Sequence, residues 1–251
     1  MTKRQRRVFE GNGLAVQLTY YGPATQMAPH SHDYHQVSFL LAGAIAERHG
    51  GRERVADQPS VGVKPAGLDH GNGYGRDGAL ILAVNLDPGR AEASAFGGDW
   101  DWSPGSAGVS PVPLIALIRD GGRDAEAAVW DLLALSQRRH RNHGPVPGWL
   151  DRVRDRLGDP DDDAGIAEMA READIHRVHL SRCFTGHFSI PPSLYRVRCR
   201  VARAMGAIAR GASLSAAAAE AGFADQAHLS RQIKRETGYT PSRFRDLLAA
   251  A

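Results

Sequence analysis

The chain has 251 residues, of which 42% are hydrophobic and 24% charged, and its formal net charge is +3. This length accommodates two domains. Because basic and acidic residues nearly balance, the overall charge alone does not identify the binding partner. The segment Met1 to Arg7 is basic, but no apolar stretch of signal-peptide length follows it. Only Cys183 and Cys199 are cysteines, and no run approaches the roughly 20 apolar residues of a membrane span. We therefore expect a reduced, cytoplasmic protein that does not contact a membrane.

The region from about residue 8 to 90 carries the signals of a β-barrel. Short apolar runs alternate there with Gly, Pro, Asn and Asp, for example at 14–20, 36–41 and 79–85. Short strands separated by regularly spaced turn residues are typical of a sandwich or a small barrel. The glycine-rich stretch 71–75 is not followed by a helix, so we interpret it as a turn rather than a phosphate loop.

Histidines gather in two short motifs within this region. The first is His30-Ser-His32-Asp-Tyr-His35-Gln36, and the second is Pro65-Ala-Gly-Leu-Asp-His70. Their spacing resembles the two motifs of cupins, whose metal-binding members carry His-x-His-x3-Glu followed by Pro-x-Gly-x2-His. The resemblance implies that these side chains meet inside the barrel.

The motifs permit two interpretations. Three imidazoles and an amide are able to hold a divalent metal, because imidazole binds zinc, iron, nickel and copper. In this chain, however, Gln36 replaces the glutamate of the cupin pattern, and Tyr74 stands where an asparagine is usual. Because the carboxylate is missing, we favour a pocket that holds no metal or other cofactor and binds a small-molecule effector. The expected effector contacts are His30, His32, His35, Gln36 and His70.

Helical patterns follow the barrel. Residues 87–113 are rich in Gly, Pro and Ser, which predicts an irregular connection. Patterns at 114–118 and 125–135 then predict helices within about 112–142. In the family that the second domain resembles, such helices often pair two subunits; the alternative is a helix that only covers the sheet, so a homodimer is left open. We place a linker at 143–148, which separates a sensing domain at 1–142 from a second domain at 149–251.

The second domain contains one tetrapeptide twice, as His179-Leu-Ser-Arg182 and as His228-Leu-Ser-Arg231, 49 positions apart. The same shift matches Ala167 with Ala216 and Ala170 with Ala219. Each copy has the pattern of a short helix, a tight turn and a second helix with a polar outer face. That pattern is typical of a DNA-binding helix-turn-helix, although an ordinary helical hairpin also has it. Two equivalent copies favour DNA binding.

A basic block supports this interpretation. Between Ile175 and Ala219 the chain has no Asp or Glu. Arg196 and Arg200 lie four positions apart in the helix expected at 191–210, where a basic face is suited to DNA phosphates. A solvated basic face is the alternative. The arginines of the block are Arg177, Arg182, Arg196, Arg198, Arg200, Arg203 and Arg210.

The segment from about Trp149 to Arg245 resembles the DNA-binding domain of AraC/XylS-type transcriptional regulators. The resemblance implies seven helices, in which one long helix joins two helix-turn-helix units that enter successive segments of the major groove. Departures from the family pattern are Ile233, where phenylalanine is usual, and Thr185-Gly-His187, where a lysine is usual. The matching stretches are 166–170, 179–184, 221–231, 234–238 and 239–245.

We therefore predict an α+β protein with a cupin-like N-terminal β-barrel, packed helices, and an all-α C-terminal domain that has its own core. The expected function is sequence-specific transcription regulation under a small-molecule effector, with no catalytic residue. Double-stranded DNA is the expected partner, and RNA polymerase is another if the protein activates transcription. The alternative is a metal-dependent cupin enzyme fused to a DNA-binding domain.

The expected DNA contacts lie mainly on the two second helices of the repeat. Arginine is able to bond guanine through two hydrogen bonds, and glutamine is able to bond adenine, so we assign guanine to Arg182 and Arg231 and adenine to Gln226. Val178 occupies a base-facing position of the first unit. The complete set of expected contacts is Arg177, Val178, Ser181, Arg182, Arg196, Arg200, Gln226, Ala227, His228, Ser230, Arg231, Lys234 and Arg235.

Overall fold

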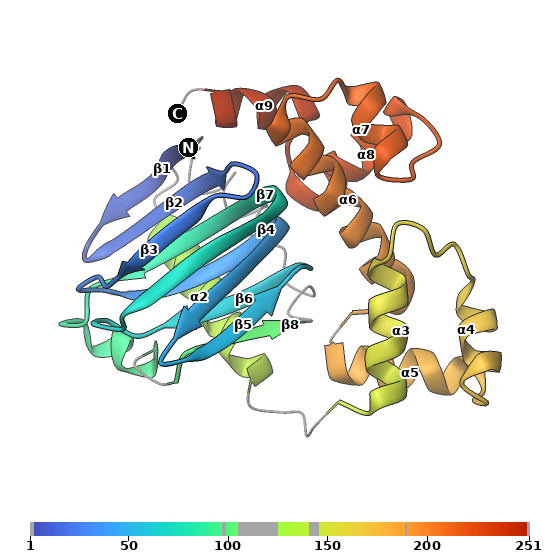
Figure 1. Ribbon diagram of the computed structural model, residues 1–251, viewed down its shortest axis with the longest axis horizontal. Helices are drawn as coiled ribbons and strands as arrows, with labels where there is room; N and C mark the ends of the chain where they lie inside the picture. Colours follow the sequence, from blue (N-terminus) through green and yellow to red (C-terminus); the bar gives the residue numbers. More distant parts are fainter. Residues whose placement is uncertain (1–2, 97–98, 105–124, 141–145, 189, 250–251) are drawn as a thin grey trace.

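The structure is a computed structural model that describes residues 3–96, 99–104, 125–140, 146–188 and 190–249. An antiparallel sheet forms the N-terminal part, and helices form the C-terminal part (Figure 1). The strands are β1 (Lys3–Gly11), β2 (Leu14–Tyr21), β3 (Gln26–His30), β4 (His35–His49), β5 (Arg52–Ala56), β6 (Ser60–Lys64), β7 (His70–Leu86) and β8 (Asp101–Pro104).

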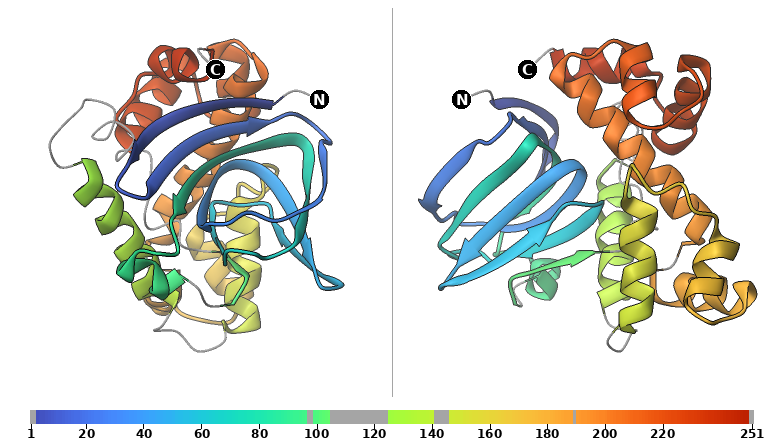
Figure 2. Two further views of the ribbon diagram at one scale, coloured as in Figure 1. Left: turned by 90° about the vertical axis from the view of Figure 1, so that its left-hand side faces the viewer. Right: turned by 45° about the vertical axis from the view of Figure 1, so that its right-hand side comes forward.

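The sheet has the strand order β1-β2-β7-β4-β6-β8, with β3 paired to β7 and β5 paired to β4. The two longest strands, β4 and β7, shift register against each other around Gly43. Gly43 and Gly78 have positive φ angles of 80° and 76° at this bend, and a side chain on Gly43 would collide with the Gly78 carbonyl. Glycine is therefore required for the bend. The sheet curls into the barrel seen in Figure 2.

Three local predictions in the barrel region were wrong. The barrel begins at Lys3 rather than at about residue 8, because the basic segment is part of the edge strand β1, in which Lys3 pairs with Tyr21 of β2. The stretch 71–75, interpreted as a turn, lies inside β7, where Gly73 pairs with Gln26 of β3. The connection 87–113 contains the 3-10 helix η1 (Ala91–Phe96) and β8, whose Trp102 packs directly over Gly62.

The helices after residue 146 agree with the family resemblance. Seven are present in the described part of this region, and α6 is the long helix expected at 191–210. In the described part of the chain, no helix has the length and apolar composition needed to cross a membrane. The helices are α2 (Ala125–His140), α3 (Gly148–Gly158), α4 (Ile166–Glu172), α5 (Arg177–Phe188), α6 (Pro192–Arg210), α7 (Leu214–Glu220), α8 (Gln226–Thr237) and α9 (Pro241–Ala249).

Two predictions fall outside the described residues, wholly or in part. The helical pattern at 114–118 lies within the range 105–124, and the linker at 143–148 is described only from residue 146. Helix α2 packs on the barrel through the buried Val129, Leu132 and Leu133. In this structure α2 therefore covers the sheet.

The apolar core does not follow the expected division into two independent domains. One cluster joins barrel residues such as Leu18 and Val84 with Ile208 of α6 and Leu229 of α8. A separate cluster holds the first helix-turn-helix unit and includes Phe184. The prediction that the C-terminal domain has its own core was thus wrong for the second unit. The physical reason is that α6 is apolar along the face that lies on β4 and β7.

Candidate DNA interface and effector pocket

The two second helices of the repeat, α5 and α8, are equivalent in length and in buried face. Each has 12 residues. Leu180 and Phe184 are completely buried on α5, and Leu229 and Ile233 are completely buried on α8. Each pair is separated by four residues, so both helices present the opposite face to solvent. The 49-residue repeat therefore holds for these two helices, which lie near opposite ends of α6 (Figure 1).

The first helices of the two units follow a different register. The amide of Ile175 donates to the carbonyl of Ala170 at 3.0 Å, and the amide of Phe223 donates to that of Ala218 at 2.9 Å. These equivalent helix ends are 48 positions apart rather than 49. The sequence matches of Ala167 and Ala170 at a shift of 49 are therefore not structural equivalences. The turn of the second unit is one residue longer.

The longer turn changes how the second helix begins. Asp225 caps α8, since its carboxylate accepts a hydrogen bond from the amide of His228 at 2.6 Å. In the first unit, the Nδ1 atom of His176 accepts from the amide of Val178 at 3.3 Å. An imidazole that accepts at Nδ1 carries its proton at Nε2. The first recognition helix, α5, therefore begins beside the Nε2–H donor of His176, whereas the second, α8, begins beside the carboxylate of Asp225.

The expected base contacts lie on the outer faces of α5 and α8. Most of them are exposed, while Ser181, Ser230 and His228 are half-buried. A groove beside α5 is lined on that helix by the predicted residues and by Thr185 and Gly186, which the sequence analysis did not assign to this surface. The exposed members of the predicted set are Arg177, Val178, Arg182, Gln226, Ala227, Arg231, Lys234 and Arg235.

The expected phosphate contacts on α6 have partners within the protein. Arg196 donates from Nη2 to the carbonyl of Ala164 at 2.6 Å, and Arg200 forms an ion pair with Asp163 at 2.9 Å. Burial lowers the pKa of Arg196. Since Asp163 is 86% exposed, the ion pair of Arg200 lies at the surface. Both arginines join α6 to the segment before α4, and their role at phosphates stays a prediction.

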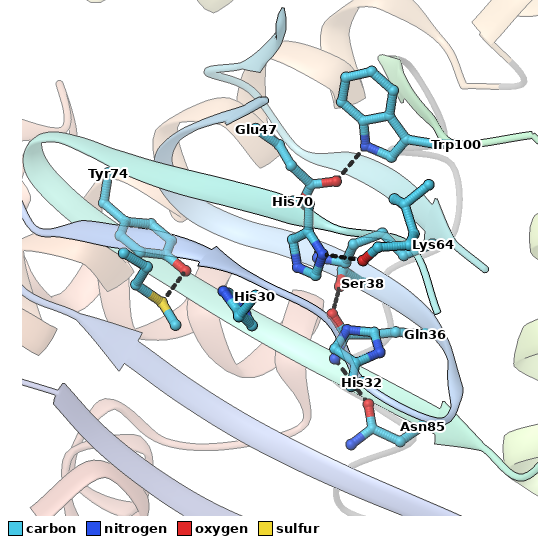
Figure 3. Close-up of polar contacts among 12 residues, drawn as sticks. His30, His32, Gln36, Ser38, Glu47, Lys64, His70, Tyr74, Asn85 and Trp100 are labelled. Carbon is cyan, nitrogen blue, oxygen red and sulfur yellow. Dashed lines mark hydrogen bonds and ion pairs between the residues drawn. The ribbon is translucent and has the colours of Figure 1, made fainter. Parts of the chain in front are cut away.

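The barrel contains a polar cavity of about 390 Å³ that is partly open to solvent. Three predicted residues, His30, His32 and His70, converge on it (Figure 3). The ring centroid of His70 lies 4.5 Å from that of His30 and 5.2 Å from that of His32. Gln36 lines the same cavity, and its amide is held between Asn85 and Ser38 by hydrogen bonds of 2.9 and 3.1 Å.

His35 lies elsewhere. It precedes Gln36 on β4, and successive side chains of a strand point to opposite faces. Its Nδ1 atom accepts a hydrogen bond from the amide of Ala66 at 3.0 Å, and His35 does not line the cavity. The structure therefore groups four of the five predicted effector contacts and separates His35 from them.

The three pocket histidines share one tautomer. Nδ1 of His30, His32 and His70 lies 2.9 to 3.0 Å from a backbone carbonyl, of Ala28, Tyr34 and Leu68 respectively. A carbonyl only accepts, so each Nδ1 carries the proton and each neutral ring keeps a lone pair on Nε2. The Nε2 atom of His32 is buried without a protein partner. The cavity therefore presents hydrogen-bond acceptors held in place by the backbone.

Burial keeps two of these imidazoles neutral. His70 is 2% exposed, and burial, followed by the charge of Lys64, lowers its pKa to about 4. Burial also lowers the pKa of His32. In the described residues, no group of three or more His, Cys, Asp or Glu side chains is arranged to hold a metal ion.

A buried ion pair lies beside the histidines, and the sequence analysis did not find it. The Nζ atom of Lys64 lies 2.8 Å from a carboxylate oxygen of Glu47, and both side chains are at most 5% exposed. The indole of Trp100 donates to the other carboxylate oxygen (Figure 3). The sequence carried little signal for this pair, because Lys64 ends the short strand β6 and Glu47 lies beside Arg48 near the end of β4. The cavity wall also includes Tyr21 and Tyr74, whose rings stack at 4.1 Å.

Comparison with known proteins gives one family match. The model of a family described as a helix-turn-helix domain matches residues 169–246, which span α5 to α8 and most of α9. No curated protein sequence matches the chain.

Several solved structures are similar to parts or all of the chain. ToxT from Vibrio cholerae O395 is 12% identical with a TM-score of 0.40, covering 95% of this chain and 99% of its own. KdgF from Halomonas sp. is 20% identical with a TM-score of 0.31, covering 36% and 82%. An RmlC-like cupin from Shewanella frigidimarina is 18% identical with a TM-score of 0.32, covering 36% and 79%.

Proposed function

We propose that the chain is an AraC-type transcription regulator that binds DNA through its helix-turn-helix domain, and that a small-molecule effector in the barrel controls this binding. The observation that carries the proposal is the set of three imidazole acceptors, on His30, His32 and His70, around one cavity of the barrel. Acceptors held in place and left without protein donors favour a ligand that brings its own donors. We propose a sensor rather than an enzyme.

The chemistry of the cavity indicates the kind of effector. A cavity of about 390 Å³ suits a small molecule. The charge of Lys64 is offset by Glu47, so this lysine does not by itself select for an anionic ligand. Hydroxyl or amine hydrogens on the effector would bond the Nε2 atoms, and Tyr74 offers an aromatic wall.

A direct connection joins this pocket to the DNA-binding helices. Ile45 and Tyr74 line the pocket on β4 and β7, and a few residues away the same strands contact α6. Asp77, beyond Tyr74 on β7, lies 3.8 Å from the guanidinium of Arg210, at the end of α6. A shift of the strands on effector binding would therefore move the helix that carries both recognition units.

A reporter assay beside a DNA-binding assay tests the sensor. Replacing His32 and His70 together by alanine is expected to abolish the response to the inducing condition while DNA binding by the full chain persists. His49→Ala is the matched control, because His49 bonds the carbonyl of Asp69 and does not line the cavity. A double variant that responds like the parent would contradict the effector site.

Duplex-binding titrations test the DNA surface. Arg182→Ala and Arg231→Ala are each expected to cost about 1–3 kcal/mol on the preferred site and to relax base choice locally. Arg200→Ala is expected to weaken binding to all sequences alike and to flatten the salt dependence of binding.

Hydroxyl-radical footprinting with the full chain should show two protected DNA segments about 10 base pairs apart on one face of the duplex. Protection of a single segment would leave only one unit at the DNA.

Two further partners belong to the proposal. RNA polymerase is a partner if the protein activates transcription. A homodimer would use the outer face of α2, which is exposed at Asp131 and Ala134. Light scattering with and without the inducing molecule distinguishes a monomer from a dimer.

A further inference from the structure

Val178 is an apolar side chain that the fold leaves in solvent. It is 43% exposed, and among the large hydrophobic residues that the structure describes, only Val55 on the β4–β5 hairpin is also exposed, at 62%. The other large apolar residues of α5, Leu180, Phe184 and Phe188, are buried. Packing within the chain therefore does not explain a valine in the first turn of α5.

The surroundings of Val178 are those of a nucleic-acid surface. It lines a groove with Arg177, Ser181, Arg182 and Thr185 of the same helix. Arg177 and Arg182 are exposed and flank the valine. A basic rim around one apolar side chain is complementary to the negatively charged backbone and the base edges of a duplex.

We propose that Val178 reads a thymine by contact with its C5-methyl group; the inference rests on the proposed DNA-binding function. Of the four bases, only thymine presents a methyl group in the major groove. Contact between the valine and this methyl removes both from water, and the valine has no hydrogen-bonding group that would fit another base edge. Val178 is thus a specificity-determining residue of the first unit.

The second unit differs at the equivalent position. Ala227 replaces Val178, and Gln226 replaces Arg177, while Ser230 and Arg231 repeat the first unit. Alanine carries a single methyl group and reaches less far from the helix. The two half-sites should therefore share the base read by the repeated arginine and differ at the bases read by the first helical turn. The full site is asymmetric.

Replacement of thymine by deoxyuridine isolates the contact, because it removes the methyl group and leaves all hydrogen-bonding groups. The preferred duplex is first selected from random sequences with the full-length protein, and each thymine is then replaced in turn. At one position of the first half-site, the parent protein should lose about fourfold in affinity, which corresponds to the burial of one methyl group. Val178→Ala should bind the thymine and deoxyuridine duplexes with nearly equal affinity.

Two controls accompany this measurement. Val178→Thr keeps one γ-methyl group and should retain part of the discrimination. Ala227→Val should create or strengthen discrimination at one position of the second half-site. Since Val178 is exposed, these variants should unfold like the parent in urea.

The outcomes distinguish failure of this inference from failure of the proposed DNA-binding function. Failure of the selection to enrich any sequence would contradict the proposed DNA binding and, with it, this contact. An enriched site would leave that function standing. A first half-site without thymine, deoxyuridine tolerated at every position, or a penalty that persists in Val178→Ala would each overturn the assignment of Val178 alone.

Discussion

Gly206 of α6 faces Ala42 of β4 so closely that a carbon added at Gly206 would lie 3.6 Å from the Ala42 side chain. That distance is an ordinary van der Waals contact, so the helix already lies against the barrel. The contact joins the strand bend at Gly43 to the helix between the two recognition units.

Substitution at Gly206 should show a sharp dependence on size. Gly206→Ala is expected to stabilise the protein by about 1 kcal/mol, because alanine favours a helix and its methyl group fits the contact. Gly206→Leu is expected to destabilise it by about 1–3 kcal/mol through overpacking against Ala42. Urea unfolding of the full chain measures both effects. Gly186→Leu on α5 is the control, since nothing lies within 4 Å of a carbon added there; equal effects of leucine at both sites would contradict a tight contact at Gly206.

Removal of one partner of the buried ion pair should be more damaging than removal of both. Glu47→Gln leaves the ammonium of Lys64 without its counter-charge in a site that is at most 5% exposed, so a loss of about 3–5 kcal/mol is expected. The double variant Glu47→Gln, Lys64→Met should be less destabilised than the single one. Denaturant unfolding of both variants measures the difference, and a double variant less stable than Glu47→Gln would contradict this expectation.

Stability should fall as the pH falls from about 6.5 to 4. The pKa of His70 is about 4 in the folded protein, so the unfolded chain, with a pKa near 6.5, binds a proton first. The stability linked to neutral His70 is complete above the unfolded pKa and is lost as the pH falls through the folded pKa. About 3 kcal/mol is expected over this range.

The pKa of His70 depends on its charged neighbours as well as on burial. Burial dominates, Lys64 and His30 lower the pKa further, and Glu47 raises it. The variant His70→Gln should reduce the change in unfolding free energy between pH 6.5 and 4 without abolishing the contribution of other groups. An unchanged pH profile in this variant would show that His70 is not the group that titrates.

The cap of the second recognition helix should be measurable by itself. Asp225→Ala removes the acceptor of the His228 amide and is expected to cost about 1 kcal/mol in urea unfolding. Asp225→Asn retains an acceptor and should cost less. Ser213→Ala, which removes the corresponding cap of α7, provides a reference at a helix that does not read bases. Loss of stability equal in Asp225→Asn and Asp225→Ala would show that the carboxylate charge matters more than the hydrogen bond.

The sequence predicted the elements that have strong local signals. The repeated His-Leu-Ser-Arg motif located both recognition helices because their buried leucines recur with helical spacing. It did not reveal the longer second turn, since a fixed shift of 49 aligned alanines in α4 and α7 that are not equivalent. In such alanine-rich helices, a one-residue offset still matches alanine with alanine.

In the barrel, the sequence predicted only part of the pocket. The histidine motifs predicted that His30, His32 and His70 meet, and the structure groups them. His35 was included because it is adjacent in sequence, yet strand alternation turns it away from the cavity. The pair of Lys64 and Glu47 depends on two strands brought together by the fold, and no local pattern reports such a contact.

The apolar contact between the barrel and α6 limits how this protein can be recombined with others. The barrel and the second helix-turn-helix unit share one core, in which Ile208 and Leu229 belong with Leu18 and Val84. A chimaera cut at the linker would place a foreign sheet under α6 and expose or mismatch that surface. Exchange of sensing specificity between regulators of this architecture should therefore succeed only when the outer residues of β4 and β7 are transplanted together with the helix that they support.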